Sequence, residues 1–236
     1  MTRQAPDYLM WDGSEYPIRD VPLAPYITMT DIDLVPPWEF NSACWRGYTA
    51  RWEVIRDRLY LLGIEGISEA HPLLLADLFP GFGQRVFAHW FTGTIDFAMD
   101  HRPVQLPGRQ PLPYSFWVRD GQVVKPQGGG NGGYRAASLD RRYEDYAPAV
   151  SSLLEQIAIP DIESSELVSD PLGAVPAMPF GHMNWKWQEF KAALATGAAL
   201  RRFSYHRRGQ IYDGYAAMKR SRIDRFVLTA IGEIDE

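Results

Sequence analysis

The chain has 236 residues, 46% of them hydrophobic and 22% charged, a composition that predicts a globular protein of one large or two modest domains and excludes a disordered chain. The net charge of −5 argues against wholesale phosphate binding, and the single cysteine, Cys44, excludes an internal disulfide. Because no apolar run is long enough to cross a bilayer and the N-terminus has no signal-peptide pattern, we expect a cytoplasmic protein without a membrane partner.

The first half of the chain has the pattern of antiparallel hairpins. Strong β formers and turn pairs predict strands or hairpins over residues 8–18, 43–54, 58–64, 85–97 and 114–124. Asp12-Gly13 and Asp120-Gly121 are the residue pairs that tight two-residue turns favour, and Arg56-Asp57 is a third predicted turn. The stretch after residue 18 contains Pro22 and Pro25 and is predicted to be extended. Residues 71–78 predict a short helix or a buried loop, and the proline-rich residues 102–113 predict an irregular excursion.

The pattern changes after a glycine-rich segment at residues 127–133, which is typical of a linker. Apolar spacing predicts helix over residues 138–158, either broken near Pro148 or divided into two shorter helices. It also predicts a helix over residues 185–195, capped by Asn184 and ended by Gly197. Three further predictions are a proline-rich loop over residues 160–181, strands over residues 200–212 and 225–234, and a short helical piece over residues 215–219.

These patterns together predict an α+β protein. Residues 1–125 form a Trp-rich antiparallel β meander or partly closed sheet, which holds six of the eight tryptophans. Residues 126–133 form the linker, and residues 134–236 form a mixed α+β domain.

Part of the first half resembles a group of short uncharacterised bacterial proteins. The residues that carry the resemblance are Ala43-Cys44-Trp45-Arg46-Gly47-Tyr48, Ala50, Trp52-Glu53, Leu78-Phe79-Pro80, Val86-Phe87-Ala88, Trp90-Phe91 and Gly93. The resemblance implies a compact bacterial β module, which sometimes occurs alone. It implies no activity and no catalytic residue, and the second half of the chain shares no such pattern.

The strand predicted over residues 43–54 and the later Trp90 supply the candidate binding residues, which are Trp45, Arg46, Arg51, Trp52, Glu53 and Trp90. Alternation puts Trp45, Arg51 and Glu53 on the face away from the core. Arg46 falls among the apolar residues, where burial requires a carboxylate partner or a bound anion. We favour an internal ion pair, with anion binding as the alternative.

No motif in the chain indicates catalysis, a metal or a cofactor. The five histidines have no ligand spacing, and no Gly-x-Ser-x-Gly segment is present. Cys44 lies in an apolar setting and is predicted to be a buried side chain rather than a nucleophile. The glycines of residues 128–133 lack the Gly-Lys-Ser/Thr ending of a phosphate loop.

Residues 201–225 are locally basic, with eight basic and two acidic residues and a net charge of +6. The candidate basic patch consists of Arg201, Arg202, Arg207 and Arg208. Interleaved aromatic residues give the segment the character of a single-strand nucleic-acid binder. A solvated face or a docking patch for an acidic protein is the favoured interpretation, so nucleic acid is not the expected partner.

The sequence favours a non-catalytic bacterial protein-interaction module, of the kind represented by an immunity protein that neutralises a toxin by binding it. One alternative is a hydrolase or nucleotide-processing enzyme with a site between the halves, formed by Arg46, Glu53 and His89. The other alternative is a nucleic-acid binder that uses residues 201–225.

Overall fold

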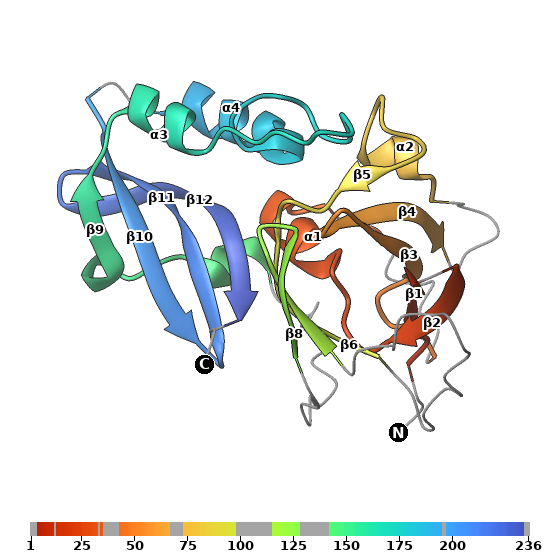
Figure 1. The fold of residues 1–236 in the computed structure, drawn as a ribbon. Coiled ribbons are helices and arrows are strands. Elements are labelled where there is room, and N and C mark those ends of the chain that lie inside the picture. The colour runs from red at the N-terminus through yellow and green to blue at the C-terminus, as the bar shows by residue number, and fades with distance from the viewer. Residues whose placement is uncertain are drawn as a thin grey trace. The chain divides into compact units, whose positions relative to one another are not determined.

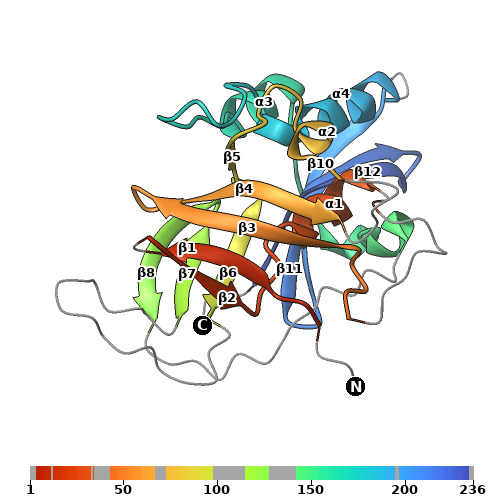
Figure 2. The ribbon, with the colours of Figure 1, turned by 90° about the vertical axis from the view of Figure 1, so that its right-hand side faces the viewer.

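The computed structural model describes residues 4–11, 13–32, 34, 43–66, 73–97, 115–127, 142–194 and 197–233. It is a mixed α+β protein with mostly antiparallel strands and few helices (Figures 1 and 2). The chain divides into two compact units, each of which is described by itself. The first unit comprises Met1–Ala24 and Ile32–Leu139, and the second comprises Pro25–Asp31 and Asp140–Glu236.

The first unit is a curled sheet with one short helix. Its elements are β1 (Asp7–Trp11), β2 (Ser14–Ile18), β3 (Tyr48–Ile55), β4 (Arg58–Gly66), α2 (Leu75–Leu78), β5 (Val86–Phe87), β6 (Phe91–Asp96), β7 (Ser115–Arg119) and β8 (Gln122–Gln127). The strand order is β2-β1-β3-β4-β8-β7-β6, and β5 pairs with β4. All described pairs in this unit are antiparallel except β1 with β3.

The two edges of this sheet meet, so the sheet closes around a core. Ile18 at the end of β2 forms an antiparallel bridge with Phe97, and the Arg19 N–H donates to the Asp96 carbonyl at 2.8 Å. Figure 2 shows β3 and β4 passing in front of β6, β7 and β8. Aromatic rings fill part of the interior, where Trp11 stacks on Phe116 with 5.9 Å between ring centroids.

Two-residue turns set the hairpins of the first unit as predicted. Asp120 and Gly121 have φ values of 48° and 74°, and Arg56 and Asp57 have values of 49° and 57°. Both turns therefore adopt the left-handed conformation that matches the twist of the flanking strands. Gly121 has a second reason to be glycine, because a Cβ there would lie 2.7 Å from the Ala88 carbonyl oxygen.

The second unit is a four-stranded antiparallel sheet with helices packed on it. Its elements are α1 (Ala24–Thr30, all but the first residue), the 3₁₀ helices η1 (Tyr143–Tyr146), η2 (Val150–Ser152) and η3 (Gly181–Met183), α3 (Ile159–Ser165), α4 (Asn184–Ala192), β9 (Leu153–Gln156), β10 (Ala199–Arg207), β11 (Gln210–Lys219) and β12 (Arg222–Glu233). The strand order is β9-β10-β11-β12.

Helices α3 and α4 cover one face of this sheet (Figure 1). Trp187 of α4 is 1% exposed, and its ring packs against those of Phe190, Phe180 and Tyr215. Its indole N–H donates to the Glu163 carboxylate of α3 at 3.0 Å, and that carboxylate also accepts from the Lys191 amine. Burial of these rings and the bonds between the helices fix the helical layer on the sheet.

Two helices occupy segments that were predicted to be extended or a loop. α1 lies in the predicted extended stretch after residue 18, and α3 begins the predicted loop over residues 160–181. Both errors come from Pro25 and Pro160, because proline in a sequence pattern usually indicates a break in a helix. Each lies in a first helical turn, where proline is tolerated because the missing N–H has no intrahelical partner.

Three predictions of helix or strand in the second half are wrong in whole or in part. Residues 142–158 contain two short helices, η1 and η2, on either side of Pro148, as one form of the prediction had it, but then form strand β9 instead of helix. Residues 200–212 are two strands that turn at Arg208 and Gly209, whose φ values are 54° and 78°. Residues 215–219 belong to β11, where three successive residues starting at Tyr215 are buried. An apolar run that is buried on both faces of a sheet has no period that separates it from a helix.

Smaller differences concern the ends of elements. β3 begins at Tyr48 rather than at residue 43, and the predicted strand over residues 85–97 is divided into β5 and β6. Asn184 is the first residue of α4 rather than its cap, and its side-chain amide donates to the Pro179 carbonyl at 2.7 Å. The predicted excursion at residues 102–113 and most of the predicted linker lie outside the described residues, so the linker stays a prediction.

Candidate functional site

A buried carboxylate organises the start of β1 and β3. The side chain of Asp7 is 0% exposed and accepts three hydrogen bonds. The donors are Arg46 Nη2 at 2.6 Å, Trp52 Nε1 at 3.0 Å and the Ala50 N–H at 3.1 Å. The predicted internal ion pair of Arg46 is therefore confirmed, with Asp7 as its partner. We call Asp7, Arg46 and Trp52 the buried cluster.

Burial and ion pairing have opposite effects on the pKa of Asp7 in the buried cluster. Burial raises the pKa of the Asp7 carboxyl, while the charge of Arg46 and the three donors oppose the rise. The Arg46 guanidinium also lies 5.4 Å from the centre of the Tyr48 ring, within the range of a cation–π contact. Since its charge is used inside the protein, Arg46 serves to hold structure rather than to bind a free anion.

Arg46 of the buried cluster belongs to a turn formed by residues 43–47, which we call the tryptophan turn. Its backbone is fixed by bonds from the Gly47 N–H to the Cys44 carbonyl at 3.1 Å and from the Cys44 thiol to the Tyr48 carbonyl at 3.1 Å. The Trp45 N–H donates to Gln4 Oε1 at 2.9 Å. Trp45 itself is 60% exposed. A large apolar ring is thus presented to solvent from a hydrogen-bonded turn.

The outward face of the neighbouring strands is polar. Arg51 of β3 pairs in register with Tyr8 of β1, and both side chains are exposed. The Arg51 guanidinium lies between Glu65 at 2.7 Å and Glu15 at 3.5 Å. Glu53, two residues further along β3, is paired with Arg85 at 2.9 Å and is partly exposed. Trp45 and Arg51 are therefore exposed, as alternation predicted, with Glu53 partly exposed.

The other two tryptophans of the candidate set are packed inside the first unit. Trp52 is 0% exposed and belongs to the buried cluster. Trp90 is 3% exposed, stacks on Phe79 at 5.5 Å and donates its indole N–H to the Pro22 carbonyl at 2.9 Å. In this conformation both rings stabilise the first unit and do not face a partner.

Two of the four arginines proposed as a basic patch are bonded to backbone. Arg201 Nε donates to the Leu154 carbonyl at 2.7 Å, and Arg207 Nη1 donates to the Asp145 carbonyl at 2.7 Å. These bonds join β10 to β9 and to η1. Arg202 and Arg208 are exposed. Arg207 is itself exposed, so it holds the second unit together and also faces solvent, whereas Arg201 is half-buried.

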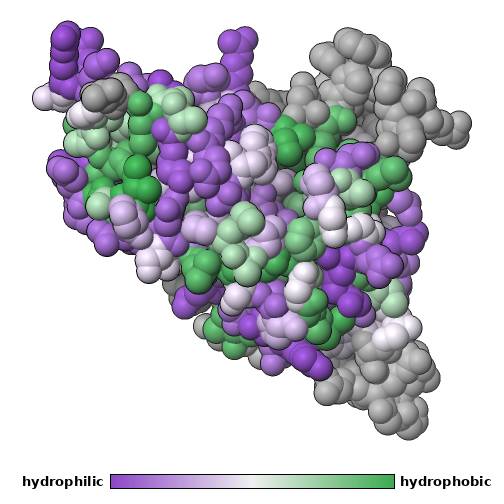
Figure 3. All heavy atoms as spheres, turned by 90° about the horizontal axis from the view of Figure 1, so that it is seen from above, coloured by the Kyte–Doolittle hydropathy of each residue, from purple (hydrophilic) through white to green (hydrophobic). Residues whose placement is uncertain are grey.

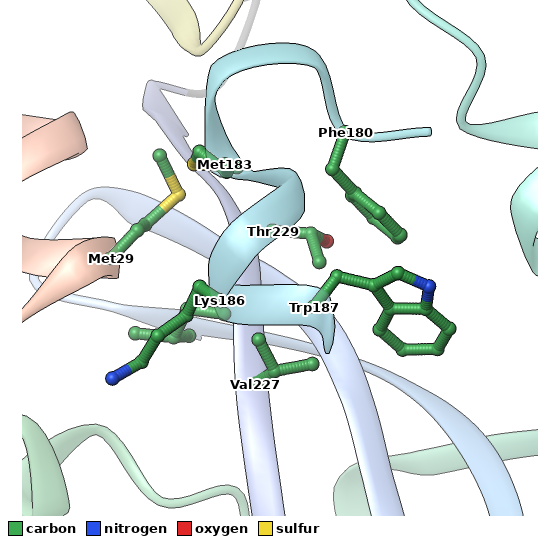
Figure 4. A pocket seen from close by; sticks show the side chains of 8 residues that line it. Met29, Phe180, Met183, Lys186, Trp187, Val227 and Thr229 are labelled. Carbon is green, nitrogen blue, oxygen red and sulfur yellow. The ribbon is translucent and has the colours of Figure 1, made fainter. Parts of the chain in front are cut away.

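A small cavity and the buried His182 lie in the described part of the second unit. Met29, Phe180, Met183, Lys186, Trp187, Val227, Leu228 and Thr229 line a cavity of about 10 Å³, which is roughly the space of one water molecule. In Figure 4 the amine of Lys186 and the ring of Trp187 point in opposite directions. His182 nearby is 8% exposed and its Nε2 lies 3.0 Å from the Ala174 carbonyl oxygen, and burial lowers its pKa to about 4.

The face with α3 and α4 also carries apolar side chains. Leu167, Leu172 and Met178 of the segment between α3 and η3 are 61%, 38% and 40% exposed. Figure 3 shows hydrophobic spheres set among hydrophilic ones on this side of the molecule, with no single continuous apolar patch. This arrangement is ordinary for a protein surface.

The three polar groups proposed for an enzyme site have separate partners. Arg46 is paired with Asp7, Glu53 with Arg85, and the His89 ring lies edge-on to Trp90 with 5.5 Å between centroids. Within the described residues, no three His, Cys, Asp or Glu side chains form a group that could hold a metal. No helix in the described part of the chain is long and apolar enough to cross a membrane.

No family model matches the chain, and no curated protein or solved structure is similar to it. The resemblance to a bacterial group thus stays a prediction. The feature that sequence reasoning missed is Asp7, whose only signal was an acidic residue on the same parity as the apolar Leu9 and Trp11 of β1. Its partner Arg46 is 39 residues away and reaches it through a parallel strand pair, which local patterns do not reveal.

Proposed function

We propose that the chain is a non-catalytic protein-interaction module with Trp45 as its anchor, and that it acts as a bacterial immunity protein which neutralises a toxin by binding it. The single observation that carries the proposal is the 60% exposure of Trp45 on the hydrogen-bonded tryptophan turn. Tryptophan is the residue type most enriched among binding hot spots, because its ring buries a large area at low entropic cost.

The buried cluster gives the anchor a fixed position. Arg46 directly follows Trp45 and is tied to Asp7 at 2.6 Å, so the turn cannot swing without breaking a buried ion pair. An anchor that is held in its binding conformation loses little conformational freedom when a partner covers it. Tyr8 and Arg51, which are register partners on β1 and β3, are also exposed and are of the types that interfaces favour.

The tryptophan content of the first half fits this proposal. Six of the eight tryptophans lie in residues 1–125, which we propose to be a Trp-rich β domain. Of those in the described residues, Trp52 and Trp90 pack inside while Trp45 faces solvent. The first unit would then be the part that meets the toxin, with the buried tryptophans as its frame.

The test uses the products of the genes that flank this one in its native host. Each product is co-expressed with the chain, and toxicity, co-purification and affinity are measured. We expect one flanking product to be toxic alone and harmless with this chain. Replacing Trp45 with Ala should then weaken binding by about 2–4 kcal/mol, or roughly 30- to 1,000-fold.

Trp185 is the matched control, because it is 46% exposed but belongs to the second unit. Trp185→Ala should leave the affinity unchanged while removing a ring of the same size. If the chain neutralises no flanking product, the immunity role is wrong. If Trp45→Ala and Trp185→Ala bind the partner as tightly as the wild type, Trp45 is not the anchor.

A further inference from the structure

The β11–β12 hairpin ends in four exposed residues, Lys219, Arg220, Ser221 and Arg222, which we call the basic tip. Lys219 and Arg222 are register partners across the last pair of the ladder, and Arg220 and Ser221 form the two-residue turn between them. Among the described ion pairs, none involves Lys219, Arg220 or Arg222.

The sequence of the basic tip is unfavourable for the hairpin itself. Like charges that face each other across a strand pair are destabilising, and Lys219 and Arg222 are placed in this way. Arg220 and Ser221 have φ values of 50° and 63°, a conformation for which Asn, Asp and Gly are the favoured residues. Local choices that oppose folding are expected at functional sites, where another requirement has selected the residue.

Three other cations of residues 201–225 are engaged in the described hydrogen bonds and ion pairs, whereas Arg202 and Arg208 are exposed and lie outside the β11–β12 hairpin. Arg201 and Arg207 donate to backbone carbonyls, and Arg225 Nε lies 3.3 Å from the Asp224 carboxylate of the same strand. The positive charge that faces solvent on this hairpin is therefore concentrated at its tip.

The chemistry of the basic tip favours phosphate as its ligand. No large hydrophobic residue within 197–233 is among the exposed ones of the described chain, so the tip has no apolar side chain to bury in a protein interface or a lipid surface. Guanidinium groups match the geometry of phosphate oxygens with two parallel hydrogen bonds. A two-stranded ribbon is also narrow enough to enter the major groove of a duplex.

We propose that the basic tip binds the phosphate backbone of duplex nucleic acid and does not read its bases. The tip supplies three cations and one short hydroxyl side chain, Ser221, so charge dominates its contacts. The net charge of −5 on the whole chain disfavours broad contact with a polyanion and favours a local contact. The basic tip belongs to the second unit, so this proposal can be tested independently of the role of Trp45.

The experiment measures the fluorescence anisotropy of a labelled duplex of about 20 base pairs with the full chain, over salt concentrations from about 20 to 200 mM. Three phosphate contacts predict that the logarithm of the affinity falls with the logarithm of the salt concentration with a slope of about −3. Arg220→Asn removes one contact and should lower the affinity roughly tenfold at about 50 mM salt. Asn suits the positive φ of this position, so the variant keeps the turn.

Arg208→Asn is the matched control. Arg208 is also exposed, also has a positive φ of 54° and also occupies the first position of a two-residue turn, at the opposite end of β11. We expect the Arg208→Asn variant to bind the duplex as tightly as the wild type does. An equal loss in both variants would mean diffuse attraction and would overturn the assignment to the tip. Absence of binding at the lowest salt would overturn the proposal, as would tighter, tip-dependent binding to phosphatidylserine vesicles or polyglutamate.

Discussion

Removal of Arg46 should destabilise the first unit more than its position in a turn would suggest. In an Arg46→Met variant the aliphatic stem of the side chain is retained, but the Asp7 carboxylate stays buried with only Trp52 and the Ala50 N–H as donors. Breaking one side of a buried ion pair costs about 3–5 kcal/mol because the remaining charge has lost its partner. A typical domain has only about 5–15 kcal/mol of stability, so the variant should lose a large share of it.

The pH dependence identifies the cause of that loss. Burial already raises the pKa of Asp7, and without Arg46 the pKa should rise further. A carboxyl whose pKa is higher in the folded than in the unfolded state binds more protons when folded, so Arg46→Met should regain stability as the pH falls towards the raised pKa. Asp7→Asn should show no such recovery, because the buried guanidinium that it leaves cannot lose its proton.

Urea unfolding followed by tryptophan fluorescence, at pH 7.5 and at pH 5, measures both effects. The double variant Asp7→Asn/Arg46→Met completes a cycle, and it should be more stable than the sum of the two single losses predicts. The reasoning is refuted if the free energy of unfolding of Arg46→Met stays within about 1 kcal/mol of the wild-type value at pH 7.5, since even an exposed ion pair can contribute that much. It is also refuted if the two single variants respond to pH in the same way.

Three further predictions concern packing and protonation. Gly214→Ala should lower the free energy of unfolding by roughly 1–3 kcal/mol or more in urea titration, because its Cβ would lie 2.1 Å from the Val227 carbonyl oxygen; an unchanged midpoint would contradict that contact. Gly121→Ala should lower the free energy of unfolding by a similar amount, because Gly121 has a φ of 74° and its new Cβ would lie 2.7 Å from the Ala88 carbonyl oxygen. A variant as stable as the wild type would contradict the close approach. Burial lowers the pKa of His182 to about 4 in the folded protein, against 6.5 in the unfolded chain. The stability that the neutral ring contributes is present above pH 6.5 and is lost as the pH falls towards 4, by up to about 3 kcal/mol. A His182→Gln variant whose stability falls as steeply with pH would contradict this assignment.

The sequence predicted those parts of the fold that depend on neighbouring residues. Asp120-Gly121 and Arg56-Asp57 turn where expected, because a two-residue turn is specified by its own residues. Alternation along β3 correctly placed Arg51 outside and Trp52 inside. The sequence could not identify Asp7 as the partner of Arg46, because β1 and β3 pair in parallel across a long stretch of chain.

The second unit was predicted less well because its signals depend on tertiary context. Tyr215 and the alanines after it are buried on both sides of β11, so their apolar run is compatible with either helix or strand. Pro160 is the second residue of α3 and does not end a helix, and the sequence alone does not show that it lies in a first helical turn. The basic patch was also too broad, since a sequence does not reveal that Arg201 and Arg207 bind backbone carbonyls.

The proposed role of Trp45 is tested most directly by ¹⁹F NMR on the full chain labelled with fluorotryptophan, to which the proposed toxin partner is added. The Trp45 resonance is assigned by its absence from a Trp45→Phe variant. We predict that it shifts and becomes shielded from a soluble paramagnetic relaxation agent when the partner binds, while the resonances of the buried Trp52 and Trp90 stay in place. A Trp45 resonance that stays equally accessible in the saturated complex would contradict the proposed anchor.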